Sequence, residues 1–432
     1  MQVISASDND IAGVPIDEIR ANILSMPSIV DARFTSKVQW YIEGYAYKYK
    51  YKTEEIFGRS VMYFPIIERY LADHGLPDDI KYLAIVESSL NPTAASGAGA
   101  VGLWQFMHGT GKEMGLEINS VVDERRNVEK ATLAAIEYLQ SLYDSFGDWS
   151  LALAAYNSGP GRVRKAIRRA GSNDFWKIQP YLPKETRNYI PAFIAINYVS
   201  KFRQRHEIRP TPPDLDMQFV RTINVYKHID FTELAQWANL PLDMVKWLNP
   251  SFKKNYIPKS VSGYPLTLPS RTMSMLEGYL LSPDAPKPEF NALMPVRISM
   301  SDRFENPYYN KIQYVVKEGD DIFKLAKKIG CNYQSIVIWN SMSSVFVNPG
   351  FVLYLYVPNT MDVSSWLNDT SVNESKIIPP LSFRLFDNIE SRRKEEFPVV
   401  EIKKVIPSSL STKVHFGRGK SRKASALYKQ YF

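Results

Sequence analysis

Residues 77–107 have the sequence PDDIKYLAIVESSLNPTAASGAGAVGLWQFM. The proline and the two aspartates at its start are typical of the first turn of a helix. Asn91-Pro92 supplies a stop signal, because the residue before a proline avoids the helical conformation, so this stretch predicts a short helix over 77–90. Helical patterns separated by Gly, Pro and Asn continue from Phe34 to Arg205 without a convincing series of strands. The sequence therefore predicts an α-helical domain over residues 31–206.

Glu87 takes a position in the 77–90 helix where an apolar side chain is expected. Ile80, Leu83 and Ala84 recur at i, i+3 and i+4 of one helix face, and Glu87 is the i+7 residue of the same stripe. An ionised carboxylate is costly on a buried face, and loss of water raises the pKa of a carboxyl group toward the range of a general acid at neutral pH. The alternative is a glutamate at the edge of the face that pairs with a lysine or arginine.

The glycines after this helix form the pattern GxGxxG, from Gly97 to Gly102. In dinucleotide-binding proteins this pattern follows a strand, whereas here it follows a helix, so we do not interpret it as a nucleotide site. Small residues instead allow the backbone to lie close to a bulky ligand. A further cluster, from Ala154 to Gly161, ends another helix with Tyr156 and Asn157. An ordinary capped helix end is the structural explanation of that cluster.

The positive charge of the chain is concentrated at its C-terminal end. The 432 residues contain 53 Lys and Arg and 45 Asp and Glu, which gives a formal net charge of +8. Residues 402–432 contain eight of these basic residues and no acidic one, so the rest of the chain is balanced. A nucleic-acid groove needs basic residues on a folded domain, and nucleic-acid binding is therefore not predicted. Contact of the tail with an anionic membrane or a wall polymer is one interpretation, and a solvated tail is the other.

The sequence predicts neither a metal nor a cofactor. Cys331 is the single cysteine, so the chain has no intrachain disulfide and no Cys/His zinc spacing. The five histidines show no HExxH spacing. Residues 1–20 lack a basic segment followed by an apolar one, so a signal sequence is not expected in the chain as given.

The second half of the chain contains an internal repeat. Aligned with itself, it places Leu234-Ala235 on Leu325-Ala326 and Asn249 on Asn340. Each copy runs from a strand-like segment through two short helical patterns to a second strand-like segment, which predicts a βααβ module. The predicted fold class is therefore multidomain, an α-helical domain followed by small α+β modules. The domain bounds we expect are 1–30 (irregular lead-in), 31–206 (helical domain), 218–270 and 311–358 (modules), and 359–432 (a final region with the basic tail).

The second copy carries Gly319-Asp320-Asp321, Leu325-Ala326, Ile338-Trp339-Asn340 and Pro349-Gly350. These motifs resemble the LysM family, whose members bind glycans that contain N-acetylglucosamine. The resemblance implies that Gly319 and Asp320, at the first turn between strand and helix, contact the glycan. The first copy is degenerate, with His228-Ile229-Asp230 at the equivalent turn, so glycan binding and a purely structural role both stay open for it.

Five motifs follow one another in the helical part: Arg59-Ser60, Glu87-Ser88, Gly102-Leu103-Trp104-Gln105, Ala155-Tyr156-Asn157-Ser158-Gly159 and Glu185-Thr186-Arg187-Asn188-Tyr189-Ile190-Pro191. Together they resemble the lysozyme-like domain of family 23 lytic transglycosylases. The LysM copies that follow are typical of a membrane-bound group within that family. His108-Gly109 departs from the family's usual proline and small residue, a change in the wall of the site rather than in the acid.

The resemblance implies a peptidoglycan lytic transglycosylase of the cell envelope, in the periplasm or at the outer membrane, whose partner is the peptidoglycan glycan strand. Glu87 would be its single catalytic acid and base, and the product would be a 1,6-anhydro sugar formed without water. The matching substrate-binding positions are Ser96, Gln105, Tyr156, Asn157, Tyr189 and Glu185. The alternatives are a goose-type lysozyme-like hydrolase, which adds water, and a non-catalytic peptidoglycan-binding protein. The sequence does not define the oligomeric state.

Overall fold

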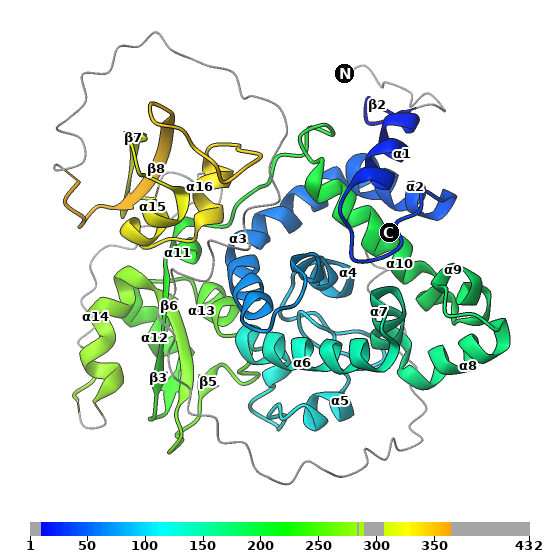
Figure 1. The fold of residues 1–432 in the computed structure, drawn as a ribbon. Helices are drawn as coiled ribbons and strands as arrows, with labels where there is room; N and C mark the ends of the chain where they lie inside the picture. Colours follow the sequence, from blue (N-terminus) through cyan, green and yellow to red (C-terminus); the bar gives the residue numbers. More distant parts are fainter. Residues whose placement is uncertain (1–9, 283–284, 289–305, 364–432) are drawn as a thin grey trace.

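The computed structural model describes residues 10–282, 285–288 and 306–363 (Figure 1). A helical domain comes first and two small α+β modules follow it, which confirms the predicted fold class. In Figure 1 the short helix α4 (Leu83–Ser88) lies near the centre of the helical domain, and both modules lie on one side of it. The basic tail over 402–432 lies outside the described residues.

The helical domain is organised around α10 (Lys184–Lys201). Nearly every side chain of α10 from Tyr189 to Val199 is buried, and the helix packs against α2, α7 and α4. A helix that is apolar on all sides is covered by other elements on all sides, so α10 forms the centre of the core. The other elements of the domain are α1 (Ile16–Ser25), α2 (Ser36–Glu43), the π-helical η1 (Gly44–Lys48), α3 (Lys50–Asp73), the 3-10 helix η2 (Asp78–Tyr82), α5 (His108–Glu113), η3 (Glu124–Arg126), α6 (Val128–Phe146), α7 (Trp149–Ser158), α8 (Pro160–Ala170), α9 (Phe175–Ile178) and η4 (Gln179–Tyr181).

The lead-in over 1–30 is more regular than the sequence predicted. From residue 10 it forms a pair of two-residue strands, β1 (Asp10–Ile11) and β2 (Val14–Pro15), followed by α1. Ile19 and Ile23, one turn apart on α1, are fully buried in the domain core. For residues 10–25 the prediction of an irregular segment was wrong: Ile16, Ile19 and Ile23 recur at i, i+3 and i+7, which is a helical spacing, and burial of these side chains holds the helix in place.

Both modules have the predicted βααβ order. In the first, β3 (Val220–Val225) pairs antiparallel with β6 (Tyr264–Pro269). In the second, β7 (Tyr309–Val315) pairs antiparallel with β8 (Val352–Pro358). Between the paired strands lie α12 (Phe231–Ala238), α13 (Leu242–Leu248) and the short pair β4 (Ile229–Asp230) and β5 (Tyr256–Ile257) in the first module, and α15 (Ile322–Ile329) and α16 (Tyr333–Trp339) in the second.

An unpredicted helix, α14 (Ser270–Leu281), follows the first module. It buries Met273, Leu276 and Leu280 in the same hydrophobic cluster as the strands β3 and β6. The module therefore continues past the expected bound at residue 270. Cys331, expected at a core position of the second module, lies partly buried there, and burial raises the pKa of its thiol.

Both modules contact the helical domain. The backbone N–H of Asp123 donates to the carbonyl oxygen of Ser251 (2.9 Å), and that of Lys253 donates to Val121 (2.8 Å), which fixes the first module. The second module lies against α3, as Figure 1 shows. The two modules also meet each other where the ring of Phe219 stacks on that of Tyr309, with 4.8 Å between ring centroids.

Candidate active site

Glu87 lies in α4, immediately before the last residue of the helix. The stretch predicted as one α-helix over 77–90 is a 3-10 turn, η2, that continues into α4 and ends at Ser88. The helix ends two residues early because Ser89 and Leu90 adopt left-handed backbone angles (φ 54° and 57°), which lets Leu90 enter the core. The apolar stripe of this segment is fully buried and Glu87 is half-buried, as its periodicity predicted.

Tyr189 donates a hydrogen bond from its hydroxyl to Oε1 of Glu87. The tyrosine lies on α10, which packs directly against α4, and its side chain is almost fully buried. A buried hydroxyl on a carboxylate fixes the orientation of that carboxylate and satisfies one of its oxygens. The structure therefore brings together two predicted site residues that lie far apart in the sequence.

Tyr156 lies at the end of α7 and is buried within electrostatic reach of the same carboxylate. Its hydroxyl donates to the carbonyl oxygen of Trp104 (2.7 Å). Burial, together with the negative charge of Glu87, raises the pKa of Tyr156 well above its ordinary value. Tyr156 therefore stays protonated over the physiological pH range and keeps the 104–105 loop next to α7.

The loop between α4 and α5 is held by its own polar groups. Oγ of Ser96 accepts from the backbone N–H of Ala100 (3.0 Å), so this predicted site residue closes a tight turn and is partly exposed. Gln105 is buried, and its Nε2 donates to the carbonyl oxygens of Ala94 (3.2 Å) and Gly102 (2.8 Å). Both side chains therefore stabilise the loop that follows the catalytic candidate.

Gly102 explains part of the glycine pattern. It has a φ of +89°, and a Cβ atom at this position would lie 1.8 Å from the carbonyl oxygen of Arg125. The small residues of this loop were expected to leave space for a bulky ligand, whereas at Gly102 the close neighbour is the backbone of Arg125. Glycine is required here because any other residue would be strained at this φ, and its Cβ atom would collide with the carbonyl oxygen of Arg125.

Asn157 and Glu185 lie where α7 ends and α10 begins. Oδ1 of Asn157 accepts from the hydroxyl of Thr186 (2.9 Å), which ties the two helix ends together. Glu185 is half-buried in the first turn of α10, where a carboxylate interacts favourably with the helix dipole. These two residues thus border the helix that supplies Tyr189.

Gly319 and Asp320 lie in the second module, at the turn between β7 and α15. Oδ2 of Asp320 accepts from the hydroxyl of Tyr314 (2.6 Å) and from the backbone N–H of Lys317 (2.8 Å), so the carboxylate closes the turn. Gly319 is exposed and has a φ of +84°. The structure therefore places this pair on a separate part of the molecule from α4.

Several residues that organise the site were not identified from the sequence. Arg59 on α3 donates from Nη2 (3.0 Å) and Nε (3.2 Å) to the carbonyl oxygen of Ser89, directly after α4. Lys81, just before α4, forms a buried ion pair with Glu68 on α3 (2.7 Å). The partners of both residues are distant in sequence, so neither contact was predictable. Arg59 appeared only within the Arg59-Ser60 motif, which assigned it no function.

Within the part of the chain that the structure describes, no group of three or more His, Cys, Asp or Glu side chains is placed to hold a metal ion.

Comparison with known families identifies the class of each part. Residues 64–179 match the transglycosylase SLT domain, residues 219–285 match the LysM-like domain of the lytic transglycosylase MltD, and residues 314–355 match the LysM domain. The chain thus combines a transglycosylase SLT domain with two LysM-type domains, and it is homologous to lytic murein transglycosylases. The resemblance drawn from the sequence motifs is confirmed.

Two curated relatives and one solved structure are among the proteins similar to this chain. The chain is 29% identical over 350 residues to the membrane-bound lytic murein transglycosylase D of Escherichia coli K12, a match that covers 80% of this chain and 72% of that protein. It is 32% identical over 162 residues to the soluble lytic murein transglycosylase of the same organism, covering 34% of this chain and 24% of the relative. The crystal structure of the 70 kDa soluble lytic transglycosylase from E. coli matches with 31% identity and a TM-score of 0.29, over 33% of this chain and 24% of that one.

Proposed function

We propose that this chain is a peptidoglycan lytic transglycosylase that cleaves the β-1,4 bond between N-acetylmuramic acid and N-acetylglucosamine without water. The observation that supports this function best is the half-buried Glu87, held by the hydroxyl of Tyr189 within the SLT domain. A carboxyl group that is partly shielded from water and oriented by a buried hydroxyl is suited to proton transfer with a substrate.

Glu87 would act first as acid and then as base. In its protonated form it gives its proton to the glycosidic oxygen as the bond from C1 of the muramoyl sugar to that oxygen breaks. The carboxylate that remains takes the proton of the C6 hydroxyl, and the C6 oxygen bonds to C1. This closes the 1,6-anhydro ring and regenerates protonated Glu87. The reaction therefore needs neither a second carboxylate nor water, whereas ordinary glycosidases use both.

The other predicted site residues divide into two groups under this proposal. Tyr189 and Tyr156 act on Glu87, by orienting its carboxylate and by fixing the neighbouring loop. Ser96, Gln105, Asn157 and Glu185 present hydroxyl, amide and carboxylate groups of the kind that hydrogen-bond sugar hydroxyl and N-acetyl groups. In the structure Ser96 and Gln105 also hold the 91–107 loop, and Asn157 ties α7 to the start of α10. Substitutions at these three would therefore affect both the shape of the site and its contacts.

The products distinguish this function from its nearest alternative. A lytic transglycosylase leaves 1,6-anhydro-muramoyl ends, whereas a goose-type lysozyme-like hydrolase adds water and leaves reducing ends. We expect mass spectrometry of muropeptides released from sacculi to show products lighter by one water than the hydrolytic ones. Reducing ends alone would assign a hydrolase, and no release at all would assign a non-catalytic binding protein.

We propose that the second module binds glycan through the turn at Gly319 and Asp320, and that the first module is chiefly structural. The exposed Gly319 allows close approach of a sugar to the backbone. The first module instead uses Ser251 and Lys253 to hold the 121–123 segment of the catalytic domain. Carbohydrate retention should therefore depend on the second copy more than on the first.

The cell envelope is the location that fits a peptidoglycan substrate, in the periplasm or at the outer membrane. No helix in the described ranges is long and apolar enough to cross a membrane. The eight basic residues of 402–432 would contribute a contact to an anionic membrane or wall polymer.

Removal of the residues after Glu401 tests this contact. We expect weaker sedimentation with anionic vesicles or sacculi at low salt and no difference at high salt, because exposed charges are screened there. Equal sedimentation at low salt would show that the tail makes no such contact.

A further inference from the structure

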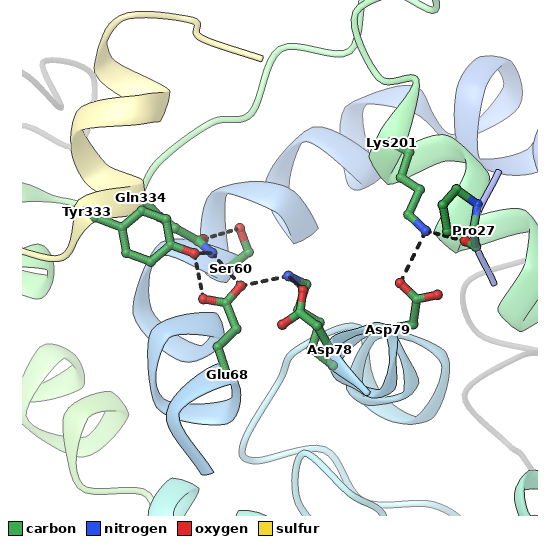
Figure 2. Close-up of polar contacts among 9 residues, drawn as sticks. Pro27, Ser60, Glu68, Asp78, Asp79, Lys201, Tyr333 and Gln334 are labelled. Atoms are coloured by element: carbon green, nitrogen blue, oxygen red, sulfur yellow. Dashed lines mark hydrogen bonds and ion pairs between the residues drawn. The ribbon is translucent and has the colours of Figure 1, made fainter. Parts of the chain in front are cut away.

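The second module completes a buried polar network on α3 (Figure 2). Glu68, in the last quarter of α3, is almost fully buried. Its Oε2 accepts from the hydroxyl of Tyr333 (2.5 Å), and its Oε1 accepts from Nζ of Lys81 (2.7 Å) and from Nε2 of Gln334 (3.3 Å). Two of the three donors to this carboxylate therefore come from α16 of the module, 265 and 266 residues away in the sequence.

Lys81 connects this network to the catalytic helix. It lies in η2, which leads directly into α4 and Glu87, and its Nζ also contacts Oδ2 of Asp78 (2.6 Å). Burial disfavours the ammonium group, but the carboxylates of Asp78 and Glu68 outweigh burial and hold the pKa of Lys81 well above its ordinary value. The lysine is therefore a fixed positive charge between α3 and the start of α4.

α3 also holds the other end of the catalytic helix. Nine residues before Glu68, the guanidinium of Arg59 donates to the carbonyl oxygen of Ser89, immediately after α4. Glu68 and Arg59 thus bind the two ends of the segment that contains Glu87. Any displacement of α3 is transmitted to both ends of that segment, because a packed interior does not deform continuously.

The module makes further contacts with α3 and with the segment that follows α10. Nδ2 of Asn332 donates to the carbonyl oxygen of Val61 on α3 (3.1 Å). Nη2 of Arg203, two residues after α10, donates to the carbonyl oxygen of Met342 (2.5 Å), and Gln204 donates to Ser341 (3.2 Å). The module therefore connects α3, which holds α4, to the end of α10, which carries Tyr189.

From these contacts we infer that the second LysM module is a positioning element of the catalytic domain, and that Tyr333 and Gln334 are positioning residues that act through Glu68 and Lys81 on the segment carrying Glu87. This inference rests on the proposed function of Glu87 and adds a role to the module besides glycan binding. A module that served only as a tether would raise the local concentration of insoluble wall and leave turnover of soluble fragments unchanged. A positioning module affects turnover of soluble fragments as well.

The test is Tyr333→Phe in the full-length chain, assayed on soluble peptidoglycan fragments. The change removes one hydroxyl and keeps the ring, so Glu68 loses one of its three donors while the interface stays filled. We expect kcat to fall roughly 3- to 10-fold with little change in KM, the range for contacts remote from a site. The matched control is Tyr354→Phe, a half-exposed tyrosine of the same module whose hydroxyl accepts from Gln313 (3.4 Å), and it should keep the kcat of the unmodified chain.

The pH dependence of kcat separates positioning from loss of folded protein. If the orientation of Glu87 toward Tyr189 changes, the carboxylate loses hydrogen-bond stabilisation, and the pKa that governs kcat moves upward. A smaller folded fraction instead lowers kcat by the same factor at every pH. A uniform decrease, or no difference from Tyr354→Phe, would overturn the inference and leave the module as a tether. Retained activity in a Glu87→Gln variant would overturn the proposed function itself, so the two failures are distinguishable.

Discussion

A Glu87→Gln variant is expected to lose peptidoglycan cleavage by at least about 10²-fold while its fold and its retention on sacculi stay unchanged. Glutamine has nearly the same shape as glutamate, and its amide oxygen can still accept the hydroxyl of Tyr189. The amide cannot give a proton to the glycosidic oxygen or take one from the C6 hydroxyl. Binding and folding therefore survive, whereas both proton transfers are lost.

The measurement is the rate of muropeptide release from purified sacculi, with thermal unfolding and sedimentation as checks on folding and binding. Glu129→Gln is the matched control, because Glu129 lies in the first turn of α6 on the same domain and forms an exposed ion pair with Arg69. We expect that control to keep full activity. Activity of the Glu87 variant within a few-fold of the unmodified chain would contradict the assignment of the catalytic acid.

The fold class was predictable because its signals are local, and the periodicity that makes Glu87 a candidate is local as well. The apolar stripe that ends in Glu87 lies within eight residues, and the structure buries each of its apolar members. The βααβ order of the modules followed from strand and helix patterns that each repeat copy contains in full. Such signals need no knowledge of which distant segment covers which face.

The direction of polar side chains was much harder to predict. Gln105 has a residue type suited to a sugar, yet its amide nitrogen bonds to the carbonyl oxygens of Ala94 and Gly102. Asp320, assigned to glycan contact by resemblance, accepts from Tyr314 and Lys317 in its own turn. A sequence gives the chemistry of a side chain but not which neighbours satisfy it, because those neighbours depend on the tertiary fold.

The contacts between domains could not be predicted from the sequence pattern. Glu68 lies among the buried residues of α3, where periodicity indicates only a charged residue in an apolar face. Its partners Lys81 and Tyr333 belong to segments 13 and 265 residues away. The sequence therefore indicated glycan-binding or structural modules and did not predict the contacts of the second module with α3.

A Lys81→Met variant is expected to destabilise the protein by about 3–5 kcal/mol, the cost typical of leaving one member of a buried ion pair without its partner. Methionine keeps the length and most of the volume of the lysine stem, so packing against the rings of Phe64 and Tyr82 is largely retained. Glu68 then keeps the hydrogen bonds from Tyr333 and Gln334 but has no positive charge to balance its own. The energetic loss is therefore electrostatic and should be visible in denaturant unfolding.

Two further variants establish that the buried charge is the cause. Adding Glu68→Gln to Lys81→Met removes the unbalanced charge while its amide oxygen can still accept the hydroxyl of Tyr333, so we expect it to recover more than half of the lost stability. Arg69→Met, on the same helix, breaks an ion pair that is exposed on both sides and should cost at most about 1 kcal/mol. If Lys81→Met lowers the free energy of unfolding no more than Arg69→Met does, Glu68 is well solvated. The ion pair of Glu68 with Lys81 then does not stabilise the start of α4.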